Sequence, residues 1–226
     1  CALDQAGVLC WGSDVAGQSN VPDLIDPQQV SAGGQHSCAI EGASVVCWGD
    51  NSAGQSVAPY LVNPVQVSAG GAHTCALDTN QVVCWGDDGF GQSTVPELIN
   101  PSLVSAGATH SCALDATGVV CWGDASAGQT FVPEGLVEAT SVSPGLYHSC
   151  AVVDQAVTCW GGNASGQTTA PTLNYVASVS AGGDHTCAVS DVGVVCWGSD
   201  EVGQSSVPGS AADEPAEAAP DAAAAQ

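Results

Sequence analysis

The feature that most constrains this chain is a repeat in which a cysteine is followed, after eight residues, by Cys-Trp-Gly. The copies lie 37 or 38 residues apart and contain all twelve cysteines and all six tryptophans. They begin at Cys1, Cys38, Cys75, Cys112, Cys150 and Cys187. A period of roughly 20–50 residues is typical of solenoids, propellers and arrays, because one unit cannot bury its apolar face alone. The chain is therefore expected to be a repeat protein.

Each unit has the composition of short strands joined by turns. In the second copy, β-branched residues occur in short segments bounded by Gly, Asn, Asp and Pro, a pattern that favours strands over helices. We expect strands near residues 29–32, 36–41 and 44–49, and a short fourth strand after Gln55. The fold class predicted from this pattern is all-β.

The cysteine spacing predicts how each hairpin is paired. If Leu3 faces Val8 and Asp4 faces Gly7, a two-residue loop remains and the cysteines occupy a non-hydrogen-bonded pair on one face. The expected disulfides are Cys1–Cys10, Cys38–Cys47, Cys75–Cys84, Cys112–Cys121, Cys150–Cys159 and Cys187–Cys196. A competing register exists, because Asp-x-x-Gly in the first and fourth copies is typical of a three-residue loop. That register would put the two cysteines on opposite faces.

Evenly spaced cysteines are typical of disulfides formed in an oxidising compartment. Zinc is the alternative, but no copy has the short Cys-x-x-Cys spacing that metal sites commonly use. The sequence shows no signal peptide and no apolar run long enough to span a bilayer. We expect a secreted or cell-surface protein that has lost its leader. Cys1 could instead carry a lipid, although its register favours pairing with Cys10.

The charge composition excludes several classes of partner. The chain has no lysine or arginine against 23 acidic residues, which gives a net charge of −23. Nucleic-acid binding requires cationic groups that replace counterions on phosphates, so DNA and RNA are excluded, and anionic membrane surfaces are disfavoured for the same reason. Cationic proteins, metal ions, neutral glycans and further copies of the chain remain as candidate partners.

Composition changes abruptly after residue 208. Residues 209–226 are rich in Ala, Pro, Asp and Glu and have no β-branched or aromatic residue. Such a segment cannot bury enough apolar surface to fold by itself. We therefore expect one folded domain over residues 1–208 and an acidic tail or linker over residues 209–226.

The repeat resembles a known family. The run Ser-Ala-Gly-Gly-x-His-Thr/Ser-Cys-Ala-Leu, followed by Val-Val-Cys-Trp-Gly and Gly-Gln, is similar to the regulator of chromosome condensation repeat, in a bacterial, cysteine-bearing, short-repeat form. The 37-residue period is similar to that of the secreted β-lactamase inhibitory propellers. The resemblance covers residues 1–208 and implies a β-propeller of about six or seven short, three- to four-stranded blades.

One blade is expected to be incomplete at the N-terminus. The segment Val-Ser-(Ala/Pro)-Gly occurs five times, whereas there are six cysteine hairpins. It begins at Val30, Val67, Val104, Val142 and Val179. The hairpin of residues 1–11 therefore lacks a leading strand, either because the natural chain extends upstream or because the ring closes imperfectly.

The resemblance implies little about activity. The eukaryotic founder of the family is a GTPase exchange factor that binds chromatin through basic residues, which have no counterpart here. There is no free cysteine, no Lys or Arg to stabilise an oxyanion, and no Ser-His-acid set distinct from the repeat, so no catalytic or cofactor-binding residue is expected. We predict a non-enzymatic structural or self-assembling surface module. The alternatives are a protein-binding or inhibitory propeller and a glycan-binding propeller.

Two sets of repeated polar residues resemble metal ligands. A histidine recurs at His36, His73, His110, His148 and His185, and a ring of imidazoles could bind metal. Oxygen-bearing residues follow each Trp-Gly: Asp14, Asp50, Asn51, Asp87, Asp88, Asp124, Asn163, Asp200 and Glu201. Most loops offer only one or two ligands, which favours Asx-type turns over calcium sites. We expect the histidines to bond backbone within their own blades, and we predict no metal site.

Five aromatic residues break the repeat and lie in connectors or loops. They are Tyr60, Phe90, Phe131, Tyr147 and Tyr175. Exposed aromatic side chains favour protein interfaces or sugar contacts, so these residues form the candidate interface. The alternative is that they pack between blades. All six tryptophans are expected to lie in the core between blades.

The unbalanced charge gives a first testable prediction. Screening the mutual repulsion of 23 negative charges should raise the stability of the folded chain. We expect the melting temperature to increase from low to high ionic strength. A melting temperature that does not change with salt would show that charge repulsion has no influence on this fold.

Overall fold

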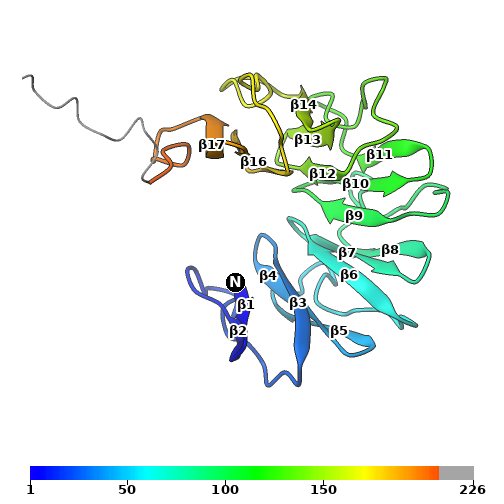
Figure 1. Ribbon diagram of the computed structural model, residues 1–226. Coiled ribbons are helices and arrows are strands. Elements are labelled where there is room, and N and C mark those ends of the chain that lie inside the picture. Colours follow the sequence, from blue (N-terminus) through cyan, green and yellow to red (C-terminus); the bar gives the residue numbers. More distant parts are fainter. Residues whose placement is uncertain (209–226) are drawn as a thin grey trace, which may run out of the picture.

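In the computed structural model, residues 1–208 are described and form seventeen strands in six sheets (Figure 1). The sequence prediction for the tail, residues 209–226, lies outside the described residues. Blade 1 is a two-stranded sheet of β1 (Ala2–Asp4) and β2 (Gly7–Leu9). Blades 2 to 6 have three antiparallel strands each, in which the first strand pairs with the second and the second with the third. The all-β propeller expected from the sequence is confirmed, including an incomplete first blade.

The bounds of the strands in blades 2 to 6 follow the repeat. Blade 2 has β3 (Pro27–Ala32), β4 (His36–Glu41) and β5 (Ser44–Gly49), and blade 3 has β6 (Pro64–Ala69), β7 (His73–Asp78) and β8 (Gln81–Gly86). Blade 4 has β9 (Leu103–Ala106), β10 (His110–Asp115) and β11 (Gly118–Gly123), and blade 5 has β12 (Ser141–Pro144), β13 (His148–Val153) and β14 (Ala156–Gly161). Blade 6 has β15 (Ser178–Ala181), β16 (His185–Ser190) and β17 (Gly193–Gly198). Within residues 1–208, no helix has the length and apolar character that crossing a membrane requires.

The blades follow one another along an arc, and an opening separates β1–β2 from β16–β17 (Figure 1). The first strand of each complete blade is the inner strand, because residues at its end line the central cavity. The second and third strands form the hairpin that carries the two cysteines. In every hairpin the register is the two-residue-loop register: Leu3 faces Val8 and Asp4 faces Gly7 in blade 1. Gly7, which follows this loop, has a φ of 114° and still pairs with Asp4. The Asp-x-x-Gly sequence therefore does not extend the loop to three residues.

Six disulfides each join the two strands of one hairpin. Their Cα–Cα distances are 4.0 to 4.1 Å, which matches the close approach of non-hydrogen-bonded pairs. The bonded pairs are Cys1–Cys10, Cys38–Cys47, Cys75–Cys84, Cys112–Cys121, Cys150–Cys159 and Cys187–Cys196. Closing so short a loop stabilises each hairpin by about 2–3 kcal/mol in the chain-entropy description.

The expected fourth strand after Gln55 is wrong. Residues 50–63 form turns and bends, and their backbone groups bond within the loop, as from Gly54 N to Asn51 O (3.1 Å) and from Val57 N to Gly54 O (3.1 Å). With these donors satisfied locally, the segment offers no ladder to a neighbouring strand. The other three predicted strands are confirmed, although β3 begins two residues earlier, at Pro27.

The hydrophobic core lies in the seams between consecutive blades. Between blades 4 and 5, Cys112 and Leu114 from one blade pack with Ala151 and Trp160 from the next, and Leu136 of the connector completes the cluster. Equivalent clusters fill the other seams from blade 2 onward. A blade therefore buries its apolar residues only when a second blade lies against it.

A hydrogen-bonded group recurs at these seams, and we call it the interblade joint. Between blades 2 and 3, the Gln55 carbonyl accepts from Thr74 Oγ1 (2.9 Å) and from Trp85 Nε1 (2.9 Å). His36 Nε2 lies 2.8 Å from the same Thr74 oxygen. Because the single hydroxyl proton goes to Gln55, the oxygen accepts from His36, whose proton is thereby assigned to Nε2. The three later joints use the carbonyls of Gln92, Gln129 and Gln167, and the joint between blades 1 and 2 uses Gln18 without a histidine.

The expectation that all tryptophans are buried holds for five of the six. Trp48, Trp122, Trp160 and Trp197 are 7% to 9% exposed, and Trp85 is partly buried. Trp11 is 67% exposed, so the prediction is wrong for blade 1. The physical reason is that a tryptophan is covered by the preceding blade, and no described residue covers that face of blade 1.

This difference supplies a matched pair of variants. Trp122→Phe removes the donor to Gln92 O and leaves space in a filled seam, which should lower the free energy of unfolding by about 1–3 kcal/mol. Trp11→Phe should cost less than about 0.5 kcal/mol, because an exposed indole contributes little. Urea denaturation of both variants and the parent measures the difference. Equal losses would show that the joint does not stabilise the fold.

Candidate interaction surfaces

Four of the five recurring histidines are part of the joints, whereas His185 of blade 6 is partly buried and faces no further blade among the described residues. The Nε2 atoms of His36, His73, His110 and His148 each bond a hydroxyl of the next blade at 2.8 Å. The expectation of backbone bonds within their own blades is therefore wrong, because the nearest acceptor is the hydroxyl beside the next disulfide. Within residues 1–208, no group of three or more His, Cys, Asp or Glu side chains is arranged to hold a metal ion.

Burial sets the protonation of these rings. Desolvation lowers the pKa of His73, His110 and His148 to about 4, and it also lowers the pKa of His36. The Nδ1 atoms of the same four rings are buried without a hydrogen-bond partner among the described residues. The rings are therefore neutral near pH 7, with the Nε2 proton used in the joint.

The oxygen-bearing loops after each Trp-Gly bond their own backbone. Asp88 Oδ1 accepts from Ser93 N (2.8 Å), and Asp88 Oδ2 accepts from the hydroxyl of Thr94 (2.6 Å), a bond that lowers the pKa of Asp88. Asp50 Oδ1 accepts from Ser52 N (3.1 Å), which is an Asx-type turn as expected. Since each carboxylate is used by its own loop, these loops serve as rigid mounts for neighbouring side chains.

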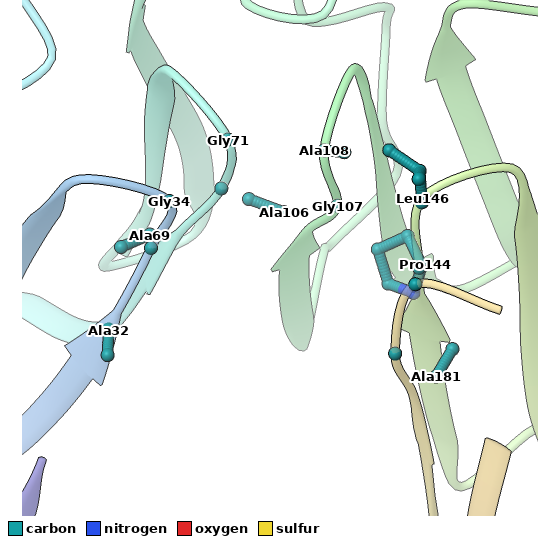
Figure 2. A pocket seen from close by; sticks show the side chains of 15 residues that line it. Ala32, Gly34, Ala69, Gly71, Ala106, Gly107, Ala108, Pro144, Leu146 and Ala181 are labelled. Atoms are coloured by element: carbon teal, nitrogen blue, oxygen red, sulfur yellow. The ribbon is translucent and has the colours of Figure 1, made fainter. Parts of the chain in front are cut away.

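The central cavity has a volume of about 430 Å³ and is lined by glycine, alanine, one proline and one leucine (Figure 2). Backbone bonds connect neighbouring blades around it, as from Gly34 N to Gly70 O (2.9 Å) and from Gly71 N to Gly107 O (3.0 Å). A Cβ atom at Gly34 would lie 2.6 Å from Gly71 O, so this approach requires glycine. The residues that line this cavity carry no titratable side chain.

The five candidate aromatics divide between two opposite faces of the arc. We call one the loop face, where the loops after Trp-Gly meet the turns before the second strands, as in the bond from Asp87 N to Ala72 O (2.9 Å). Phe90, Phe131 and Tyr147 lie on the loop face, in blades 3 to 5. We call the other the hairpin face, because it carries the two-residue hairpin loops.

Tyr60 and Tyr175 lie on the hairpin face. Tyr60 shares a surface cavity with Ser44 at the hairpin of blade 2, and the residue after Tyr175 donates to Gln155 O in the hairpin loop of blade 5 (2.9 Å). All five aromatic side chains are exposed, from 45% for Tyr147 to 91% for Tyr60. None of the five is buried between blades, which leaves them available to a partner.

Two of the loop-face aromatics flank one seam. Tyr147 O accepts from Gly162 N at 2.7 Å, and a Cβ atom at Gly162 would lie 3.2 Å from Tyr147 Cβ. Across the seam, a Cβ atom at Gly128 would lie 3.7 Å from the Phe131 ring and 4.0 Å from Gly161 Cα. The glycine pair that follows Trp160 thus leaves room for two aromatic side chains on the loop face. The sequence gives a signal for this pair, because the other copies have Asp or Ser at the second glycine.

Tyr175 has a backbone conformation that is rare for a bulky residue. Its φ is 51°, in the left-handed region, and the same repeat position holds Asp26 (55°) and Asn100 (50°). Asp and Asn adopt left-handed backbone angles with little strain, whereas a bulky residue such as tyrosine is strained there. The exposed ring of Tyr175 is therefore held at a local energetic cost, an arrangement that recurs at binding sites.

The joint histidines make stability dependent on pH. Their folded pKa of about 4 lies below the unfolded value of about 6.5, so the unfolded chain binds more protons between these pH values. Stability should therefore fall as the pH decreases from about 6.5 to about 4, by on the order of 1–2 kcal/mol per buried ring. Denaturant midpoints measured across this window test the prediction. His110→Gln should reduce the pH dependence, and an unchanged slope would contradict the assignment.

Comparison with known proteins agrees with this architecture. Residues 65–92, 102–129 and 176–204 match the family described as Regulator of chromosome condensation (RCC1) repeat. No curated protein matches the chain in sequence. Each matched segment spans the three strands of one blade, in blades 3, 4 and 6, together with the loop that follows the Trp-Gly pair.

Solved structures show the same fold. The ectodomain of the receptor kinase CR4 from Physcomitrella patens is 27% identical, with a TM-score of 0.67 over 84% of this chain and 55% of that one. The CRINKLY WD40 ectodomain of the receptor kinase ACR4 from Arabidopsis thaliana is 28% identical, with a TM-score of 0.61 over 76% of this chain and 63% of that one. Prp20p from Saccharomyces cerevisiae is 20% identical, with a TM-score of 0.64 over 76% of this chain and 57% of that one. This chain thus spans less than two thirds of each of these structures.

Six disulfides within single hairpins indicate an oxidising, extracytoplasmic environment. Three of the six blades thus match the regulator of chromosome condensation repeat, and the chain has the propeller fold of the solved structures that it resembles.

Proposed function

We propose that this chain is a non-enzymatic, extracytoplasmic propeller that binds proteins and serves as a self-assembling structural module at a cell surface. The observation that carries the proposal is the set of five exposed aromatic side chains, of which Phe90 lies in a loop that Asp88 closes by bonding Ser93 N. Rigid exposed aromatics supply contact area at a low cost in conformational entropy. A surface of this kind fits a binding role better than a catalytic one.

The relatives support a protein partner. The two plant structures are ectodomains of receptor kinases. Prp20p is described with its binding to Gsp1p and histones, and yeast RCC1 is described in complex with Kap60. These partners belong to those proteins. What supports the proposal is that propellers of this fold are described with protein partners.

Self-association is compatible with the composition once salt screens the repulsion between the acidic residues of two copies. The chain has no lysine or arginine, and Phe131 and Tyr147 lie beside glycines on the loop face. Two such surfaces can meet through Phe131 and Tyr147 without placing an unpaired cation in the interface. A cationic protein is the second candidate partner, since the net charge of −23 would accelerate its association.

The proposal is tested with the full chain. Sedimentation velocity at increasing protein concentration, at low and high salt, should show association that strengthens with salt, and electron microscopy should show extended assemblies. Phe131→Ser combined with Tyr147→Ser should weaken the association, whereas Val137→Ser, at another exposed apolar position, should not. A chain that stays monomeric under all conditions while one tight heterologous partner is recovered would favour the second candidate. Binding to glycan arrays that is lost in Tyr60→Ser would contradict both.

A further inference from the structure

We infer that a cavity on the hairpin face of blade 3 is a binding site for an arginine side chain carried by a partner protein. The inference rests on the proposed protein-binding role and names one site and one chemistry for it. Blade 3 lies between two complete blades of the arc, so described neighbours surround the cavity on both sides (Figure 1). None of the five candidate aromatics lines it, and its evidence is therefore independent of them.

The cavity has a volume of about 280 Å³ and lies between the connector that leads from blade 2 to blade 3 and the hairpin of blade 3. On the connector side it is bordered by Val62, which is 64% exposed. The hairpin contributes Asp78, at the end of β7, and the exposed residues Thr79, Asn80 and Gln81. Asp78 itself is only 2% exposed. A buried carboxylate therefore borders a cavity whose other lining residues are open to solvent.

The Asp78 carboxylate is a buried charge without a cation. Its two oxygens accept from Val62 N (3.1 and 2.9 Å), and one of them also accepts from Asn63 N (2.6 Å). Within residues 1–208, these two backbone groups are the hydrogen-bond donors of this side chain. A carboxylate can accept about four hydrogen bonds, so part of its capacity is unused. Buried charges are ordinarily paired, and the sequence contains no lysine or arginine that could do so.

The equivalent carboxylate of blade 4 shows what is different in blade 3. Asp115 also holds its connector, because one oxygen accepts from Ile99 N (2.8 Å). Its other oxygen accepts from the backbone N–H and the hydroxyl of Thr117 in its own hairpin, at 2.7 and 2.6 Å. In blade 3 both oxygens are bonded by the connector, and no described hairpin residue donates to the Asp78 side chain. The donors that the hairpin supplies to Asp115 are thus left for a ligand to supply to Asp78.

The other lining residues favour arginine over lysine. Thr79 offers a hydroxyl, and Asn80 and Gln81 offer amide oxygens, in addition to the Asp78 carboxylate. A guanidinium carries five N–H donors in a planar fork and can bond several acceptors at once, whereas an ammonium is a compact charge with three donors. Val62 supplies an apolar wall for the methylene stem. The net charge of −23 attracts cationic proteins to the surface as a whole, and this cavity gives one arginine a specific place.

The experiment titrates the full chain with an acetylated and amidated Val-Arg-Val tripeptide in about 0.15 M salt, which screens non-specific attraction. The control tripeptide has citrulline in place of arginine, which keeps the shape of the side chain and removes its charge. Amide resonances are followed by heteronuclear NMR. We expect saturable shifts confined to Val62, Thr79, Asn80 and Gln81 with the arginine tripeptide and none with the control. Shifts spread over all acidic loops would overturn the inference, because they would report only the net charge.

A matched pair of variants tests the assignment to blade 3. Asp78→Asn keeps an oxygen for the connector N–H groups and removes the charge, so it should weaken binding by about tenfold or more. Asp115→Asn makes the same change in blade 4 and should leave binding unchanged. Unaltered binding in Asp78→Asn, or an equal loss in both variants, would contradict the site.

A third variant leaves the connector bonds of Asp78 intact, in case Asp78→Asn does not fold. Gln81→Leu removes one acceptor from the cavity at a position where other copies have Ser44 or Gly118. It should weaken binding of the arginine tripeptide, and unchanged binding would count against the site. If sedimentation shows self-association but the tripeptide produces no confined shifts, the proposed function stands and this inference fails. Confined shifts in a chain that stays monomeric would instead contradict self-assembly alone.

Discussion

The structure depends on the backbone carbonyl of a glutamine that lies in each seam between blades. This one oxygen accepts from a tryptophan indole and from a hydroxyl beside the next disulfide, as Gln92 O does from Trp122 and Ser111. The Ser111 hydroxyl in turn accepts from His73 of the preceding blade. Four residues that recur separately in the repeat are therefore one hydrogen-bonded unit that joins consecutive blades.

Because each joint needs a blade on both sides, residues at the same repeat position are more exposed in the first and last blades of the arc. Trp11 is exposed because the blade that would cover it is not among the described residues, and Val189 is 43% exposed although its counterparts in the other complete blades are 1% to 6% exposed. The opening in Figure 1 is thus bordered by two surfaces that are buried everywhere else in the molecule. In a repeat protein a blade buries its apolar residues against its neighbours, which is why exposure rises at both ends of the described arc.

The candidate interaction surfaces follow from the same division of roles. Residues that repeat in every copy build joints and turns, whereas residues that differ between copies are free of that constraint. Tyr147 and Phe131 are accommodated because Gly162 replaces an aspartate or serine in one copy only. Tyr175 occupies a left-handed position that Asp26 and Asn100 fill in other copies. Both departures place an aromatic ring outward on a rigid support.

The sequence by itself determined the repeat, the all-β class, the hairpin register and the missing strand of blade 1, because cysteine spacing and strand alternation are local and act within about ten residues. It did not determine the partner of each histidine, the exposure of Trp11, the loop that replaces the expected strand after Gln55, or the division of the aromatics between two faces. Those features arise from contacts between residues about 20 to 40 positions apart. Only the curvature of the assembled blades brings such residues together, and no spacing within a single repeat encodes it.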